Sequence, residues 1–325
     1  MMYPCRDVRI VSRSTETSSP QFPEPVRIPR RCQCRIAPKE VGCTFVWESE
    51  DQQHYCGSHW DPFYDSPVEV LEAVPGLIPE SMPHGGFGDT YPGPHEVPES
   101  WHKGAYLCWP SFQRGLIAAL RVSEKRAELV NVSPYAERGV QVSIGVERVQ
   151  VWSSGAEAQM EGLWGEAPVA FYDLTYLSSR GWYELGRRLA FILNGIAYKA
   201  SPASGEDLVV SPDSVLGGWL LSEPESRPTP ELRIGLEGSS IFVRVDDWDR
   251  DDYWFRGPVR RVTAFSDWLG QSGWSVRVCV MQMHDGDAEL EIQITSRAWS
   301  RPEPPRVGED IEGSLWLQGR LWDLA

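Results

Sequence analysis

The sequence predicts a mainly β protein, organised as two tandem small barrels behind an irregular, Pro/Gly-rich N-terminal region. Apolar and polar residues alternate in several stretches, most clearly in "VQVSIGVERVQVW" at 140–152, and a period of two is typical of half-buried strands. The 325 residues include 29 Gly and 26 Pro, which favours many short elements joined by turns. They also include 15 Trp, and large aromatic side chains are common in strands.

The first 110 residues are predicted to form two N-terminal segments. Residues 1–30 are rich in Ser, Thr and spaced prolines and carry an excess of basic residues, which predicts a disordered basic leader. Residues 31–110 are predicted to be an irregular α+β region. Its expected elements are a strand at "VGCTFVW", a short helix with Ser66 as N-cap and Pro67 at the first position, and a long loop after Pro75-Gly76.

The first barrel is predicted over residues 111–200. Its opening stretch, "GLIAALRVSEKRAELVNV", fits a helix by composition or a hairpin that turns at "SEKR". We favour the hairpin because the neighbouring segments are strands. The alternating segments that follow end near Tyr198 in "GRRLAFILNGIAY".

A linker is predicted over residues 201–231, and the second barrel over residues 232–325. Expected strands are "LRIGL", "SIFVRV", "WSVRVCVMQM" and "AELEIQIT", with "HDGD" as a hairpin turn. The acidic stretch "DDWDRDD" at 246–252 is predicted to be a solvated loop. Calcium binding is the alternative, because its carboxylates have hard-ligand spacing, but the glycine and distal glutamate of an EF-hand loop are missing.

The two predicted barrels end in similar sequences. "LNGIAY" at 193–198 matches "LQGRLW" at 317–322, and each is preceded by a Gly-x-x-[Leu/Ile] step, at Gly186 and Gly308. Two such closing strands predict two related barrels. A glycine within a strand marks a bend or a close backbone approach, and the neighbouring carboxamide is expected to satisfy exposed backbone groups.

The final strand is predicted over residues 308–322, with Gly319 at a bend. Because side chains alternate along a strand, Leu315, Leu317 and Leu321 are expected to face the barrel interior. Trp316 then lies on the opposite face, which we expect to meet the first barrel or a partner.

The segments "PVAFYDLTYL…GRRLAFILNGIAY" and "VGEDIEGSLWLQGRLW" resemble bacterial proteins of unassigned function with OB-like β-barrels, which end in a GxxIxGxxWLQG-type strand. The resemblance covers about residues 140–325 and implies the fold only: the two barrels would be OB-like. It supplies no catalytic or binding residue.

The charge distribution restricts the classes of partner. The chain has a net charge of −15, although residues 1–40 are basic. An acidic body repels phosphate backbones, which argues against non-specific nucleic-acid binding by the whole protein. No apolar stretch reaches the about 20 residues of a membrane span, and the N-terminus lacks a signal-peptide core. We therefore expect a cytoplasmic protein without membrane association.

One group of residues has the chemistry of a zinc site. Thiolates and imidazoles are the ligands that zinc prefers, but the spacing contains no C-x2-C pair. We therefore expect ordinary thiols and no cofactor, with structural zinc as the alternative. The candidate ligands are Cys32, Cys34, Cys43, His54, Cys56 and His59.

No catalytic residue is predicted. His84, Asp89 and His95 gather in a Gly/Pro-rich loop and include an acid–base pair. The chain nevertheless lacks G-x-S-x-G, H-E-x-x-H and phosphate-loop motifs. A loop packed on a barrel mouth is the simpler interpretation.

The sequence predicts a non-enzymatic binding protein that acts through contacts with another protein, in an accessory or bacterial defence or immunity role. Interfaces are enriched in Trp and Tyr. The first alternative is a binder of single-stranded nucleic acid or oligosaccharide that uses barrel aromatics. The second is a metal-dependent enzyme built on the Cys/His group or the His-rich loop. The candidate binding residues are Trp248, Trp254, Trp268, Trp274 and Trp316.

Overall fold

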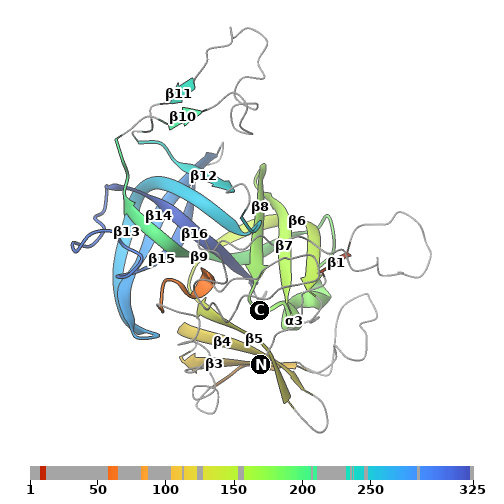
Figure 1. Ribbon diagram of the computed structural model, residues 1–325. Coiled ribbons are helices and arrows are strands. Elements are labelled where there is room, and N and C mark those ends of the chain that lie inside the picture. The colour runs from red at the N-terminus through yellow and green to blue at the C-terminus, as the bar shows by residue number, and fades with distance from the viewer. Residues whose placement is uncertain are drawn as a thin grey trace, which may run out of the picture.

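A computed structural model describes the fold (Figure 1). The described residues are 8–11, 58–64, 82–86, 104–111, 113–122, 127–152, 157–205, 208–210, 232–234, 236, 238–244, 248–283 and 286–322. The prediction of a mainly β protein is confirmed, because strands dominate these residues and the α-helix α3 is a single short turn.

The N-terminal elements, through the four-stranded sheet, are β1 (Val8–Val11), η1 (Ser58–Trp60), β2 (Met82–Gly86), β3 (Gly104–Pro110), β4 (Arg114–Val122) and β5 (Ala127–Ala136). The central elements are β6 (Val140–Trp152), β7 (Ala158–Trp164), β8 (Ala167–Asp173), α3 (Tyr176–Ser179), η4 (Arg180–Trp182) and β9 (Arg188–Pro202). The C-terminal elements are β10 (Leu208–Val210), β11 (Leu232–Ile234), β12 (Ile241–Arg244), β13 (Asp252–Trp268), β14 (Gln271–Met283), β15 (Gly286–Thr295) and β16 (Asp310–Leu321).

These strands form one 10-stranded sheet, a 4-stranded sheet of β2–β5, and a 2-stranded sheet of β10 and β11. The predicted hairpin at 115–132 is confirmed, because β4 and β5 pair antiparallel. It belongs to the small sheet together with β3, however, and not to the sheet that contains the rest of residues 111–200. In Figure 1 the small yellow sheet forms a separate layer below the green and blue strands.

Within the large sheet the pairings close into two circuits. One runs β6–β7–β8–β16–β9 and returns to β6, and the other runs β13–β14–β15–β9–β16 and returns to β13. Each circuit therefore contains four strands from one half of the chain and the closing strand of the other half. The two halves are not simply in tandem, because β9 and β16 belong to both circuits.

The two halves repeat the same pattern in detail. Gly186 and Gly308 both have positive φ, +81° and +85°, before their closing strands. The Gly186 N–H donates to the Val146 carbonyl at 2.7 Å, and the Gly308 N–H donates to the Val259 carbonyl at 2.8 Å. An irregularity follows each of these valines, in the β6–β7 and β13–β14 pairs. We call β6–β9 the first repeat and β13–β16 the second repeat.

The two similar closing motifs pair with each other. Asn194 lies opposite Gln318 in the antiparallel β9–β16 pair, with the motif glycines on either side. The Asn194 amide donates to the Ala136 carbonyl at 2.9 Å, and the Gln318 amide donates to the Pro134 carbonyl at 2.8 Å. Both carboxamides thus satisfy backbone groups of β5, and they tie the small sheet to the centre of the large one.

Two cores lie on opposite faces of the shared strands. The larger one is enclosed by the two circuits and includes Leu315 and Leu317 of β16. The smaller one includes Trp316, together with Trp268 and residues of β3–β5 and η1. The predicted alternation of the final strand is therefore confirmed, and its second face is covered by the small sheet, by Tyr172 of β8 and by the segment that contains His59.

The predicted bend at Gly319 is not accompanied by a break in strand pairing. The β9–β16 register is continuous at Gly319, and the irregularity lies between Ser314 and Leu315. Gly319 is required for a different reason: a Cβ at this position would lie 2.4 Å from a ring carbon of Phe171 and 2.7 Å from the Leu193 side chain. Close packing of neighbouring core side chains, rather than backbone conformation, selects glycine here.

Replacing Gly319 by alanine is expected to lower the free energy of unfolding by about 1–3 kcal/mol, the range for overpacking a core. Urea denaturation measures this change. Gly145→Ala is the matched control, because it is also a strand glycine but a Cβ there meets nothing within 4 Å. Equal stabilities of the two variants would contradict the packing explanation.

The N-terminal predictions are only partly covered by the described residues. Val8–Val11, within the predicted disordered leader, forms β1 and pairs with β6, and β10 lies within the predicted linker. The predicted strand at 41–47 and helix at 66–74 lie outside the described residues. No helix in the described part of the chain is long and apolar enough to span a membrane.

Candidate functional site

A cleft of about 610 Å³ is lined by Arg114 of the small sheet, by the connection between β5 and β6, and by strands of both repeats. It is the candidate site because charged residues from strands far apart in the sequence converge on it. The lining residues are Arg114, Glu137, Arg138, Gly139, Gln141, Ile192, Arg261, Thr263, Ala264, Ser275, Arg277, Glu291, Arg320 and Trp322.

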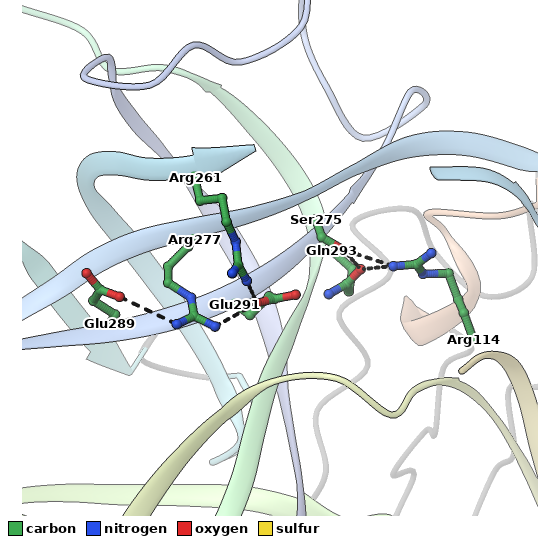
Figure 2. Close-up of polar contacts among 7 residues, drawn as sticks. All are labelled: Arg114, Arg261, Ser275, Arg277, Glu289, Glu291 and Gln293. Carbon is green, nitrogen blue, oxygen red and sulfur yellow. Dashed lines mark hydrogen bonds and ion pairs between the residues drawn. The ribbon is translucent and has the colours of Figure 1, made fainter. Parts of the chain in front are cut away.

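Two arginines stand side by side on one wall of the cleft. Arg261 of β13 is the cross-strand partner of Arg277 on β14, and like charges directly opposite each other destabilise a sheet. Glu291 of β15 offsets part of this cost, because one of its carboxylate oxygens accepts from Arg261 at 2.7 Å and from Arg277 at 2.9 Å (Figure 2). Glu289 lies 3.7 Å from Arg277. One buried carboxylate therefore bridges two guanidinium groups.

Arg114 enters the cleft from the small sheet. Its guanidinium donates to the Ser275 hydroxyl at 2.8 Å and to the Gln293 side-chain oxygen at 3.0 Å, as Figure 2 shows. It also lies 4.1 Å from the centre of the Phe265 ring. Partial burial lowers the pKa of Arg114, with Glu291 opposing the shift. The hydrogen-bond partners of this cation in the cleft are thus neutral groups.

Arg320 and Trp322, at the end of the chain's last strand, also line the cleft. The Arg320 guanidinium lies 4.0 Å from Glu137 and 5.8 Å from the Trp322 ring centre. Trp322 is 39% exposed, so its indole is accessible to a ligand. Arg138, also exposed, is a further lining residue.

The cleft carries five arginines against two glutamates, which leaves a local excess of positive charge in a chain of net charge −15. Several buried donors at the cleft or beside it lack a hydrogen-bond partner among the described residues. They are Arg114 Nε, Arg277 Nε, Arg320 Nε and Gln293 Nε2. Unsatisfied buried donors are costly, and together with the excess charge they are suited to an anionic ligand.

The described part of the acidic stretch, residues 248–252, is not the solvated loop that the sequence predicts, because Asp251 and Asp252 are buried. Asp251 accepts from the Gln159 amide at 2.8 Å and from the Trp316 indole N–H at 3.0 Å. Asp252 accepts from the Tyr198 hydroxyl at 2.5 Å. These donors, contributed by β7, β9 and β16, are what allow the two carboxylates to be buried, and no linear pattern in the sequence reveals them.

A further buried carboxylate, Asp173, lies at the end of β8. It accepts hydrogen bonds from the Thr175 N–H at 2.9 Å and from the Tyr183 hydroxyl. Burial raises the pKa of Asp173 to about 6, although these hydrogen bonds oppose the shift. Its partners are all in the connection between β8 and β9, so we assign it to the local structure of that connection.

The predicted binding tryptophans do not form one surface. Trp268 and Trp316 are each 1% exposed and belong to the core between the sheets. Trp274 packs against the larger core. Trp248 lies with its ring 6.1 Å from that of Tyr198, and Trp254, like Trp248 and Trp274, is half-buried. The exposed indoles that the described residues present are instead Trp182 and Trp322.

The predicted zinc ligands Cys32, Cys34, Cys43, His54 and Cys56 lie outside the described residues. His59 is described: its ring stacks on Trp316 with centres 3.8 Å apart. The described part of the chain contains no group of three or more side chains suited to a metal ion. Of the His-rich loop, His84 falls in β2, and Asp89 and His95 lie outside the described ranges.

Sequence reasoning missed the arginine cleft. Arg114, Arg277 and Arg320 are about 160 and 40 residues apart, and each reads as an ordinary polar position of an alternating strand. The one local signal was "VRRV" at 259–262, where two adjacent arginines interrupt a strand. No family model, no curated protein and no solved structure matches this chain, so the resemblance to OB-like bacterial proteins stays a prediction.

Proposed function

We propose that this protein is a non-enzymatic binding protein that holds an anionic segment of another protein in the arginine-lined cleft. The observation that carries the proposal is the paired Arg261 and Arg277, which share Glu291 and are joined in the cleft by Arg114 and Arg320. A sheet position that places two guanidinium groups side by side costs stability, and this cost is understandable if the charge serves binding.

The size and chemistry of the cleft support ligand binding. Its volume of about 610 Å³ lies in the usual range for ligand sites. Its lining contains no Ser–His or Cys–His pair to supply a nucleophile. Arginine forks recognise carboxylates and phosphates through paired hydrogen bonds, so the lining has the chemistry of anion recognition.

We also infer that each circuit of pairings is a small OB-like barrel. Five strands per circuit and a shared, buried interior support this inference. The cleft would then lie on the outer face of the second barrel, where the small sheet covers it only partly.

Single-stranded nucleic acid is the second candidate ligand, and one observation favours it. Trp322 is exposed on the cleft rim beside Arg320, an arrangement that suits base stacking next to a phosphate. The acidic character of the chain as a whole opposes long nucleic acids. We therefore place the protein ligand first.

The Arg138→Gln/Arg320→Gln double variant is expected to lose its protein partner while keeping its fold. Both residues line the cleft, and neither carries the bridge between Arg114 and the second repeat. The experiment is affinity capture from nuclease-treated extract of the native host, with the retained proteins quantified by mass spectrometry. We expect at least a tenfold loss of the specifically retained protein.

The matched control is Arg187→Gln/Arg188→Gln, which removes the same charge from exposed positions away from the cleft. It should retain the partner. Capture that survives in the cleft variant, or that disappears from the wild type after nuclease treatment, would overturn the proposal.

A further inference from the structure

Equivalent positions can be identified in the β6–β7 pair of the first repeat and the β13–β14 pair of the second. The β6–β7 pairing has an irregularity after Val146, and the β13–β14 pairing has one after Val259. The first cross-strand pair beyond each irregularity is Arg148–Glu161 in the first repeat and Arg261–Arg277 in the second, so these two pairs correspond. Two steps further along the same strands, Gln159 corresponds to Ser275.

The matching closing strands extend this correspondence. Trp316, which precedes the "LQG" step, corresponds to Ile192, which precedes the "LNG" step. Tyr198 corresponds to Trp322 at the ends of the two motifs. Four positions of the circuit formed by β13, β14, β15, β9 and β16 therefore have identified counterparts, and all four line the cleft: Ser275, Arg277, Ile192 and Trp322.

In the circuit formed by β6, β7, β8, β16 and β9, these counterpart positions hold a segment of the protein's own chain, residues 250–252. Arg250 lies 2.6 Å from Glu161 in an ion pair. Asp251 accepts from Gln159 and Trp316, and Asp252 accepts from Tyr198. One short segment with two neighbouring carboxylates thus contacts all four counterpart residues.

The second repeat differs from the first at the residue that decides the charge of the segment it can bind. Arg277 stands where the first repeat has Glu161, so a residue in the place of Arg250 would have to be acidic. Arg114 takes the place of Asp251: it binds Ser275 as Asp251 binds Gln159, and its Nε is left unpartnered and buried. A carboxylate can therefore bind to Arg114 itself.

We infer that the cleft binds a short peptide segment with neighbouring acidic side chains, in the way that the first repeat binds residues 250–252 but with an acidic residue at the position of Arg250. This inference rests on the proposed function and specifies its ligand. One carboxylate meets Arg277, a second meets Arg114, and the segment lies against Trp322, the counterpart of Tyr198. The charges of the ligand complement the excess of arginine in the cleft.

The probe is a fluorescently labelled peptide with the sequence of residues 246–253 carrying R250E, added to the full-length protein at low salt. Fluorescence anisotropy measures its affinity. We expect saturable binding that weakens at least tenfold when the Asp and Glu residues of the peptide are replaced by their amides. The peptide with the natural Arg250 should bind at least fivefold more weakly than the R250E peptide, because Arg250 would face Arg277.

Variants of the protein test the assigned contact. In Arg277→Gln the preference for the R250E peptide over the natural sequence should largely disappear, whereas Arg187→Gln/Arg188→Gln should retain it. If Arg277→Gln does not fold, the comparison of the acidic, amide and natural peptides on the wild-type protein is enough to test the inference. Equal binding of the acidic and amide peptides, or an unchanged preference in Arg277→Gln, would overturn the inference.

Competition separates this inference from the broader proposal. Inorganic phosphate and a short oligothymidylate are added to the bound peptide, and tighter binding of the oligonucleotide than of the peptide would overturn the peptide ligand. If capture of the native partner depends on Arg138 and Arg320 but the acidic peptide neither binds nor competes, the proposed function stands and this inference fails. If partner capture is independent of the cleft, the proposed function fails whatever the peptide does.

Discussion

Replacing Trp316 by alanine is expected to lower the free energy of unfolding by about 3–5 kcal/mol, the range for removing a large aromatic residue from a core. The indole is 1% exposed and stacks on His59 with ring centres 3.8 Å apart. It also packs on Tyr172 and donates its N–H to the buried carboxylate of Asp251. The variant therefore creates a cavity between the two sheets and removes a charge-assisted hydrogen bond.

Urea denaturation followed by far-ultraviolet circular dichroism measures the effect of Trp316→Ala. Trp182→Ala is the matched control, because Trp182 is 48% exposed, and a change within about 0.5 kcal/mol is expected at such a surface position. If both variants were as stable as the wild type, the packing between the small sheet and the shared strands would be wrong.

Leu317→Ala is expected to cost about 2–5 kcal/mol in the same measurement, because a fully buried leucine leaves a cavity when it is truncated. Leu317 is 0% exposed and belongs to the core enclosed by the two circuits. Its strand, β16, pairs with β8, β9 and β13, so it takes part in both circuits. We expect a single cooperative transition at lower urea concentration rather than separate unfolding of the two repeats.

Val307→Ala is the control for this second variant, because Val307 is 67% exposed and precedes the same strand. Its transition should coincide with that of the wild type. Two resolved transitions in Leu317→Ala, with one unchanged from the wild type, would argue against a shared strand and for two independent barrels.

The local features of the fold followed from the sequence because they depend on short-range physics. Alternating side chains identified the strands, since a pleated strand places every second residue on one face. The same alternation assigned Leu315 and Leu317 to one core and Trp316 to the other face. The repeated closing motifs revealed the internal duplication, and their carboxamides indeed satisfy backbone groups.

The pairing of those strands was decided only by the tertiary structure. Nothing local in "LNGIAY" or "LQGRLW" states that the two motifs pair with each other, because partner choice between strands depends on which hydrophobic faces meet after folding. Gly319 illustrates the limit: the sequence indicated that a glycine was needed, but the cause is the Phe171 ring, which comes from a strand more than a hundred residues earlier.

The candidate site depended on the tertiary structure still more strongly. Arg114, Arg277 and Arg320 become one site only when the small sheet packs against the second repeat, because their separation along the chain hides their shared charge. Asp251 and Asp252 of the acidic stretch change role for the same reason: composition predicts a solvated loop, whereas donors from Gln159, Trp316 and Tyr198 allow these two carboxylates to be buried. The sequence by itself determined many of the strands, the two faces of the last strand and the similarity of the two closing motifs, which are short-range properties of the chain. Only folding decided which strands are shared and where charge accumulates, because both depend on contacts between distant residues.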